Sequence, residues 1–85
     1  MKIKLHKDFE KQYKKLRENE KKKFKTRRDL FLLDEFHPTL NNHTLKGKYL
    51  GYRSINITGD LRAVYVKNGD EVTFITVDSH SNLYS

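Results

Sequence analysis

The sequence predicts a small α+β domain with the element order β-α-α-β-β-β, in which an N-terminal helical hairpin packs on one face of a small, mostly antiparallel sheet. Two observations support this fold class. Lysine-rich segments with helical spacing lie between residues 8 and 37, and short apolar alternations separated by glycine turns fill residues 49–77. The 85 residues are enough for one domain, residues 1–85, with one modest core.

The N-terminal elements follow from the spacing of apolar residues. Ile3 and Leu5 alternate with lysine and histidine, which is typical of a half-buried strand. Asp8 is expected to cap the first helix and Asn19 the second. The second helix ends before Pro38, because proline pushes the preceding residue out of the α region. The apolar faces of the two helices contain seven residues: Phe9, Tyr13 and Leu16 in the first, and Phe24, Leu30, Phe31 and Leu33 in the second.

The second half is predicted to contain a loop followed by three strands. The loop covers Pro38 to Asn42. Asn68-Gly69-Asp70 is a strong hairpin signal, so the last two strands are expected to be antiparallel. The first strand of the chain then joins this sheet at one edge or between neighbours, and the face opposite the helices stays open. The three strands are expected at Tyr49 to Ile57 with an interruption at Gly51, at Leu61 to Val66, and at Val72 to Val77.

Positive charge is concentrated in the N-terminal third. Residues 1–28 hold 13 of the 18 lysines and arginines and four acids (13 − 4, a net charge of +9), whereas residues 29–85 hold five and seven (5 − 7, a net charge of −2). Such a basic amphipathic hairpin favours a polyanionic partner such as nucleic acid, or an acidic protein surface. A lysine-rich helix face that meets only solvent is the alternative.

The composition argues against several classes of protein. The chain has no cysteine, and therefore neither disulfides nor thiolate metal sites. No apolar run approaches the roughly 20 residues of a membrane span, and the first residues lack the apolar stretch of a signal peptide. His37 and His43 have no carboxylate at metal-ligand spacing. We therefore expect a cytoplasmic protein with no metal, no cofactor and no membrane association.

Five residues with acid–base or phosphate-binding chemistry occur in the second half: His43, Asp60, Arg62, His80 and Tyr84. They fall in a loop, at strand ends and in the polar tail, so they can meet on the open face of the sheet. Metal-free RNA cleavage needs a general base, a general acid and a cation that stabilises the phosphorane. The sequence therefore predicts RNA cleavage by attack of a ribose 2′-OH on the adjacent phosphate.

Each catalytic candidate has two interpretations, a catalytic role and an ordinary structural or solvent-exposed role. His80 is the expected general acid, unless it is an exposed histidine without function. His43 is a base or phosphate ligand, or a loop histidine bonded to the backbone. Asp60 is a base, an orienting partner of His80 or Arg62, or an ordinary turn aspartate. Arg62 is the expected clamp on the scissile phosphate, because a guanidinium binds two phosphate oxygens at once; a solvent-facing strand arginine is the alternative.

Tyr84 and three further residues complete the predicted RNA site. Lys46 and Lys48 are expected phosphate contacts. Arg53 is counted with them, but an ion pair that holds structure or backbone is the role that we favour for it. Tyr84 stacks on a base or donates its hydroxyl, unless it closes the core together with Leu83.

Four stretches of the chain, in this order and at this spacing, resemble the RelE/ParE toxin superfamily, and most closely its YafQ-like branch of mRNA interferases. The stretches are His43-Thr-Leu-Lys46-Gly47, Gly51-Tyr52-Arg53-Ser54, Gly59-Asp60-Leu61-Arg62-Ala63-Val64-Tyr65, and Ser79-His80-Ser-Asn-Leu-Tyr84. The resemblance implies a microbial-RNase-like fold and a toxin of a type II toxin–antitoxin pair. RelE and YafQ toxins cut mRNA in the ribosomal A site, so inhibition of translation is implied as well.

The resemblance also implies partners and leaves alternatives. The expected partners are a cognate protein antitoxin, mRNA on the ribosome and ribosomal RNA. The chain is expected to be a monomer by itself and to form a hetero-oligomer with the antitoxin. YafQ-like members carry a histidine where this chain has Asn56, a tryptophan often where it has Leu61, and a phenylalanine commonly where it has Tyr84. Two other functions stay open: a ParE-like gyrase inhibitor, and an inactive RelE-fold protein that only binds its partner.

Overall fold

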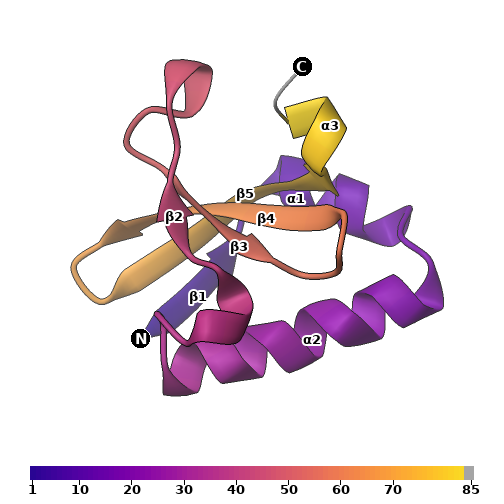
Figure 1. Cartoon of the computed structure of the whole chain (residues 1–85), viewed down its shortest axis with the longest axis horizontal. Coiled ribbons are helices and arrows are strands. Elements are labelled where there is room, and N and C mark those ends of the chain that lie inside the picture. The colour runs from indigo at the N-terminus through magenta and orange to yellow at the C-terminus, as the bar shows by residue number, and fades with distance from the viewer. Residues whose placement is uncertain (84–85) are drawn as a thin grey trace.

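A computed structural model of the chain describes residues 1–83. The predicted α+β class is confirmed, with N-terminal helices packed on a five-stranded, mostly antiparallel sheet (Figure 1). Two short 3-10 turns also occur, η1 (Pro38–Leu40) and η2 (Gly47–Tyr49). The helices and strands are β1 (Lys2–Leu5), α1 (Lys7–Lys14), α2 (Glu18–Leu33), β2 (His43–Thr44), β3 (Arg53–Asn56), β4 (Leu61–Asn68), β5 (Glu71–Ser79) and α3 (His80–Leu83).

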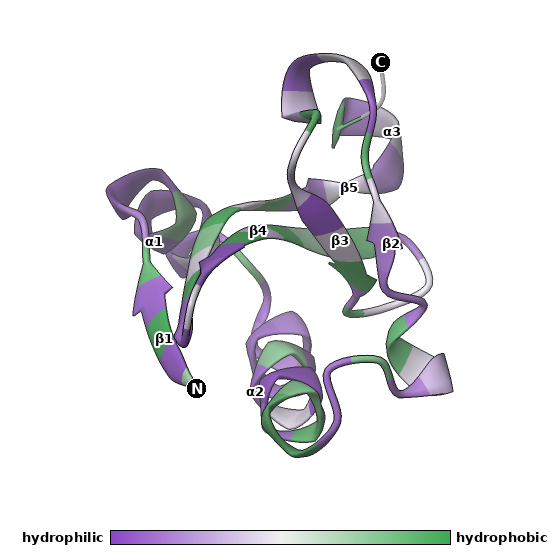
Figure 2. Ribbon diagram, turned by 90° about the vertical axis from the view of Figure 1, so that its left-hand side faces the viewer, coloured by the Kyte–Doolittle hydropathy of each residue, from purple (hydrophilic) through white to green (hydrophobic). Residues whose placement is uncertain are grey.

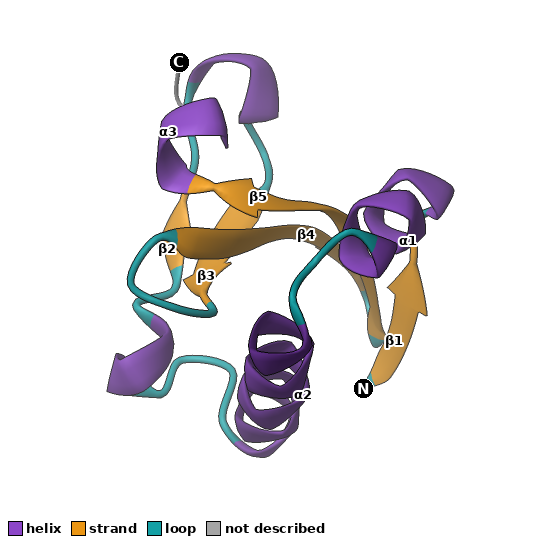
Figure 3. Ribbon diagram, turned by 90° about the vertical axis from the view of Figure 1, so that its right-hand side faces the viewer, coloured by secondary structure: helices purple, strands orange, loops and turns teal. Residues whose placement is uncertain are grey.

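The sheet has the strand order β1-β5-β4-β3-β2. β1 lies at one edge and pairs with β5 in parallel, and the other pairs are antiparallel. α2 crosses one face of the sheet, whereas α3 rises from the other side (Figure 3). The sequence had left two positions open for the first strand, at an edge of the sheet or between neighbouring strands, and the structure has it at an edge. Within residues 1–83, no helix is long and apolar enough to cross a membrane.

The main core lies between the helices and the sheet, with α2 beneath the strands in Figure 2. Fully buried aromatic rings from three elements meet there, Phe9 of α1, Phe31 of α2 and Phe74 of β5. The opposite face was expected to be open, but a second, smaller cluster of buried residues covers part of it. This cluster consists of Leu45, Val64 and Leu83, with Tyr49, Tyr52 and Ile75 packed against it.

Both predicted helix caps are wrong by two residues. α1 begins at Lys7, and the Nδ1 atom of His6, not Asp8, accepts the first-turn hydrogen bond, from the Asp8 amide at 3.1 Å. α2 begins at Glu18 after Arg17, whose amide donates to Glu20 Oε1 at 2.9 Å. Free amide groups at the start of each helix are thus hydrogen-bonded, although the residues that precede the helices, His6 and Arg17, are not among the preferred caps serine, threonine, aspartate and asparagine. Leu33, predicted to be buried, is the last residue of α2 and is 86% exposed.

The predicted strand from Tyr49 to Ile57 is shorter in the structure and begins at Arg53. Gly47 and Gly51 have φ values of +66° and +92°, which a strand does not tolerate, so the segment between them turns instead of extending. The sequence prediction also missed β2, the η1 turn and the helical start of the tail. β2 has only two residues and exists through pairing with β3, so it carries no local pattern.

Candidate active site

Arg62 lies in the middle of a cross-strand row on the face opposite α2. In the sheet register it pairs with Asn56 on β3 and with Asp78 on β5, and directly paired residues share a face. Its Nη1 atom donates to the carbonyl oxygens of Thr58 at 3.0 Å and Leu61 at 3.2 Å. A guanidinium has five N–H donors, and within residues 1–83 no hydrogen bond or ion pair engages Nε or Nη2, so these donors suit an anion. The half-buried side chain is thus held in place while keeping donors for a phosphate.

His80 and Asp60 meet at the same end of the sheet. The His80 amide donates to the Asp60 carbonyl at 2.8 Å, which joins the start of α3 to the β3–β4 turn. His80 follows Asp78, the strand partner of Arg62, by two residues. The structure therefore brings Asp60, Arg62 and His80 together. The contact between Asp60 and His80 runs through main-chain atoms, and both residues are exposed to solvent.

His43 lies on the same face, on the other side of β3. It pairs in register with Ser54, which in turn pairs with Val64 of the small cluster. Its Nδ1 atom is 2.8 Å from the carbonyl oxygen of Asn41. A carbonyl only accepts, so this contact places a proton on Nδ1 and leaves Nε2 as the basic nitrogen of the neutral ring. Two strand spacings, about 10 Å, separate the strand of His43 from that of Arg62.

The remaining predicted RNA contacts fall into two groups. Lys46 and Lys48 are exposed on the segment between β2 and β3, and Lys48 Nζ lies 5.3 Å from the ring centre of Tyr49. Arg53 alternates with Ser54 and so points to the helix side of the sheet. Its Nε donates to Asn42 Oδ1 at 2.7 Å, so its partner is an amide and not the carboxylate of an ion pair. Tyr84 lies outside the described residues.

Sequence reasoning included neither Ser54 nor Asn56 among the site residues, although both lie on the site face and YafQ-like members carry a histidine at the position of Asn56. Ser54 Oγ and Asn56 Oδ1 are buried and have no hydrogen-bond partner within residues 1–83. Buried polar atoms are rarely unpaired, so both atoms suit contacts with a bound ligand. The signal that could have found them is the turn at Thr58-Gly59-Asp60, because a hairpin there aligns Asn56 with Arg62.

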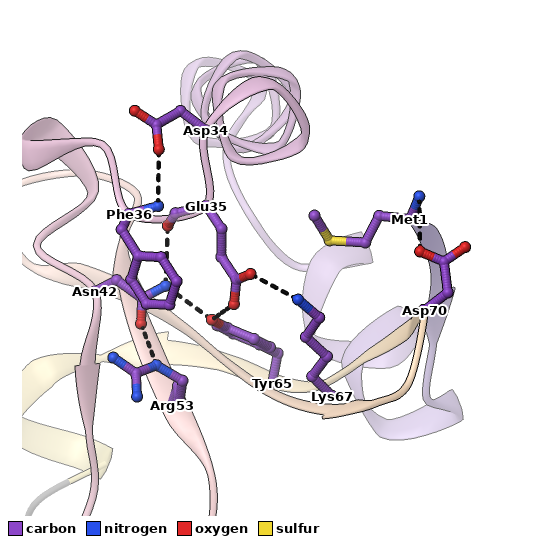
Figure 4. Close-up of polar contacts among 9 residues, drawn as sticks. All are labelled: Met1, Asp34, Glu35, Phe36, Asn42, Arg53, Tyr65, Lys67 and Asp70. Carbon is purple, nitrogen blue, oxygen red and sulfur yellow. Dashed lines mark hydrogen bonds and ion pairs between the residues drawn. The ribbon is translucent and has the colours of Figure 1, made fainter.

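A polar network on the helix side anchors the segment before His43 (Figure 4). The amide of Asn42 donates to the carbonyl of Glu35 at 3.0 Å and to the Tyr65 hydroxyl at 2.8 Å. Tyr65, which is fully buried, donates to Glu35 Oε2 at 2.8 Å, and Lys67 Nζ donates to Glu35 Oε1 at 2.9 Å. Because Asn42 adjoins His43, this network sets the position of β2 relative to β3.

The network shifts the pKa of both acids. Burial would raise the pKa of Glu35, but hydrogen bonds from Lys67 and Tyr65, and the positive charges of Lys67 and Arg53, hold it below the ordinary value. Burial raises the pKa of Tyr65 to about 12, and the neighbouring Glu35 carboxylate adds to this, against the Asn42 hydrogen bond and the Arg53 charge. At neutral pH the network therefore contains a carboxylate and a neutral phenol.

Replacing Tyr65 with phenylalanine is expected to lower the free energy of unfolding by about 1–3 kcal/mol. The change keeps the buried ring but removes the hydroxyl that links Glu35 to Asn42. Urea denaturation measures the effect. The control is Tyr13→Phe, whose hydroxyl makes only a 3.4 Å contact with the Lys21 carbonyl and whose loss is expected to change stability by no more than about 0.5 kcal/mol. Equal losses in the two variants would contradict the network's role.

The raised pKa of Tyr65 also predicts an alkaline loss of stability. A group that holds its proton more tightly when folded stabilises the protein fully below its ordinary pKa near 10, and this contribution is lost as pH rises through about 12. Urea titrations between pH 9 and pH 12, a range chosen to bracket these values, should show a steeper loss for the wild type than for Tyr65→Phe. Parallel curves for the two proteins would refute this assignment. For Glu35 the sign is opposite, since its contribution is lost as pH falls through its lowered pKa.

The described part of the chain contains no group of three or more histidines, cysteines or acids that could hold a metal ion. What the site face does contain is an imidazole with a basic Nε2, a second exposed imidazole and a positioned guanidinium. These groups can accept a proton, donate a proton and stabilise negative charge on a phosphate.

Comparison with known families gives a match over the whole chain. The family model described as "Bacterial toxin of type II toxin-antitoxin system, YafQ" matches residues 1–85. No curated protein sequence matches the chain.

Solved structures with the same fold include toxins alone and toxins in complexes. YafQ from E. coli strain BL21(DE3) has 18% identity and a TM-score of 0.82, with 98% of this chain and 97% of that chain covered. The chain from the E. coli DinJ–YafQ complex has 21% identity and a TM-score of 0.68, with 98% and 97% covered. The chain from the RelB–RelE antitoxin–toxin complex of Methanococcus jannaschii has 23% identity and a TM-score of 0.74, with 94% and 93% covered. These likenesses show a RelE-like fold.

Proposed function

Because this chain belongs to the YafQ family of bacterial toxins from type II toxin–antitoxin systems, we propose that it is an endoribonuclease that cleaves mRNA on the ribosome and so inhibits translation. Toxins of this family are ribonucleases. The single observation that carries the proposal is the meeting of Asp60, Arg62 and His80 at one end of the sheet, on the face that also holds His43.

In the proposed reaction, His43 Nε2 takes the proton of the ribose 2′-OH, and the 2′ oxygen attacks the adjacent phosphorus. The new 2′ O–P bond forms as the bond from phosphorus to the 5′ oxygen breaks. His80 donates a proton to the departing 5′ oxygen, which leaves a 2′,3′-cyclic phosphate and a 5′-hydroxyl. Arg62 stabilises the phosphorane through its Nε and Nη2 donors. Asp60 helps to orient His80 or Arg62, and no metal takes part.

The proposed partners follow from the family and the charge. E. coli YafQ has been crystallised with DinJ, and we propose a cognate protein antitoxin for this chain, which would be a monomer when free. The basic α1–α2 hairpin is proposed to contact ribosomal RNA. Binding through phosphates releases counterions, so association with ribosomes should weaken strongly as salt concentration rises. This activity places the protein in the cytoplasm.

Primer-extension mapping on a translated message tests the proposed function. Purified protein added to translating ribosomes should create discrete cuts in the mRNA, and the Arg62→Ala, His80→Ala double variant should create none. Intact mRNA together with equal growth inhibition by both proteins would refute the proposal. A DNA-supercoiling assay with gyrase on the same samples separates the ParE-like alternative, since the proposed enzyme should leave supercoiling unchanged.

A further inference from the structure

A cleft of about 650 Å³ opens on the sheet face that carries Arg62. Its walls come from α1, from the segment around η2 and from the middle of β5. Thr76 in its floor pairs with Val64, which shares a face with Arg62 two residues away. Within residues 1–83, none of the predicted catalytic residues lines the cleft. The side chains that matter here are Lys11, Gln12, Lys15, Tyr49, Tyr52 and Thr76.

Two tyrosines form an aromatic wall. The rings of Tyr49 and Tyr52 are half-buried, with centroids 6.4 Å apart and planes inclined by 75°. The small cluster around Val64 supports them from below. Lys48 Nζ lies over the Tyr49 ring. Rigid aromatic rings beside cations are what single-stranded nucleic acid binds, because every base has a face that can stack.

Gln12 supplies a fixed polar group on the opposite wall. Its Oε1 atom accepts from Thr76 Oγ1 at 2.8 Å and from the Val77 amide at 3.1 Å. A backbone amide only donates, so these contacts settle which end of the Gln12 side chain is oxygen. Its Nε2 donors have no hydrogen-bond partner within residues 1–83 and remain available to the edge of a base.

The cleft carries a positive wall. Lys11 and Lys15 are four residues apart at the end of α1, so they lie on the same helix face, and both are exposed. Among the described lining residues, Asp8 is the one acid, so the lysines give this part of the cleft a net positive charge. Two lysines at this spacing suit the phosphates of a nucleic-acid backbone.

We infer that this cleft binds single-stranded RNA, with a base stacked on Tyr49 or Tyr52, Gln12 against its edge, and Lys11 and Lys15 on the phosphates. The inference rests on the proposed function, because it assigns the path of the same substrate. Thr76 of β5 precedes His80, the first residue of α3, by four residues, or about 13 Å along an extended strand. The bound nucleotide is therefore one that flanks the cleaved linkage.

An NMR titration of the isotope-labelled full chain with a 2′-O-methyl RNA trinucleotide tests the inference, since this RNA cannot be cut. The largest shifts are expected at the Gln12 side-chain amide and at the Tyr52 ring. Tyr52→Ala should weaken binding about tenfold, and Tyr52→Phe should retain it. Lys11→Glu combined with Lys15→Glu should weaken binding by a similar factor. The matched control combines Lys2→Glu with Lys4→Glu, which makes the same charge change on β1, outside both the cleft and the α1–α2 hairpin, and should change affinity by less than about threefold.

Each outcome of this experiment is informative. Shifts confined to other surfaces, or equal losses in the two lysine pairs, would overturn the subsite. A short polyglutamate peptide serves as a second probe, and cleft variants that lose the peptide but keep RNA would assign the cleft to a protein partner and overturn the inference. Cleavage of ribosome-bound mRNA is measured separately on the wild type. If the protein cleaves mRNA but no RNA binds in the cleft, only the proposed subsite is refuted. If RNA binds in the cleft but mRNA is not cleaved, the subsite is supported and only the proposed reaction is refuted.

Discussion

Arg62→Ala is expected to slow mRNA cleavage by about 10²- to 10³-fold, with little change in ribosome binding. Removing one preorganised donor from a site of developing negative charge typically has an effect of this size. Arg62 is preorganised because its Nη1 atom is tied to the carbonyls of Thr58 and Leu61. Single-turnover cleavage of mRNA on programmed ribosomes measures the rate of the chemical step.

Arg62→Lys separates geometry from charge. Lysine keeps the positive charge but cannot hold two carbonyls and a phosphate with one planar group, so it should recover only a small part of the lost rate. Thermal unfolding of both variants checks that the β3–β4 turn is intact. A rate for Arg62→Ala within about threefold of the wild type would show that Arg62 does not stabilise the transition state.

His80→Ala is expected to slow cleavage by about 10²- to 10⁴-fold, the usual contribution of a general acid or base. The assigned role predicts a specific rescue. A message with sulfur in place of the 5′ bridging oxygen at the cut site has a leaving group that needs no proton. On this message His80→Ala should approach the wild-type rate, whereas Arg62→Ala should remain slow.

His37→Ala is the matched control for the loss of a histidine. His37 accepts a hydrogen bond from the Thr39 amide at the start of η1 and belongs to no part of the proposed site. Its activity should equal that of the wild type on both messages. If His80→Ala stays slow on the sulfur-containing message, His80 does not act as the general acid.

Local patterns predicted the parts of the fold that local chemistry determines. The Asn68-Gly69-Asp70 turn joins β4 and β5, and Gly69 has the positive φ, +59°, that such a turn requires. The alternation of apolar residues in β4 and β5 likewise follows from one face packing against the helices. Asp60, Arg62 and His80 were expected near one another because they fall at strand ends and at the start of the tail, and the β4–β5 register with the His80–Asp60 main-chain bond places them at one end of the sheet; their role in catalysis stays a prediction.

Long-range contacts explain what the sequence could not predict. Arg53 was predicted to contact RNA or to hold structure through an ion pair, but it bonds to the Asn42 amide, 11 residues away, and Asn42 bonds to Tyr65, 23 residues away. The hydrogen-bond network around Tyr65 joins three segments that are far apart in the sequence, so no local sequence pattern predicts it. β2 likewise depends on β3 for its existence. The cleft between α1 and the tyrosines near η2 was missed for the same reason, because its walls meet only in the folded chain.

The chemistry of the cut ends tests the account most directly. Mass spectrometry of mRNA fragments from programmed ribosomes should find a 2′,3′-cyclic phosphate on the upstream fragment and a 5′-hydroxyl on the downstream one. A single 2′-deoxy nucleotide placed before the scissile phosphate should abolish the cut. Fragments that end in a 3′-hydroxyl and a 5′-phosphate, or an undiminished cut at the deoxy position, would contradict a reaction driven by the 2′-OH.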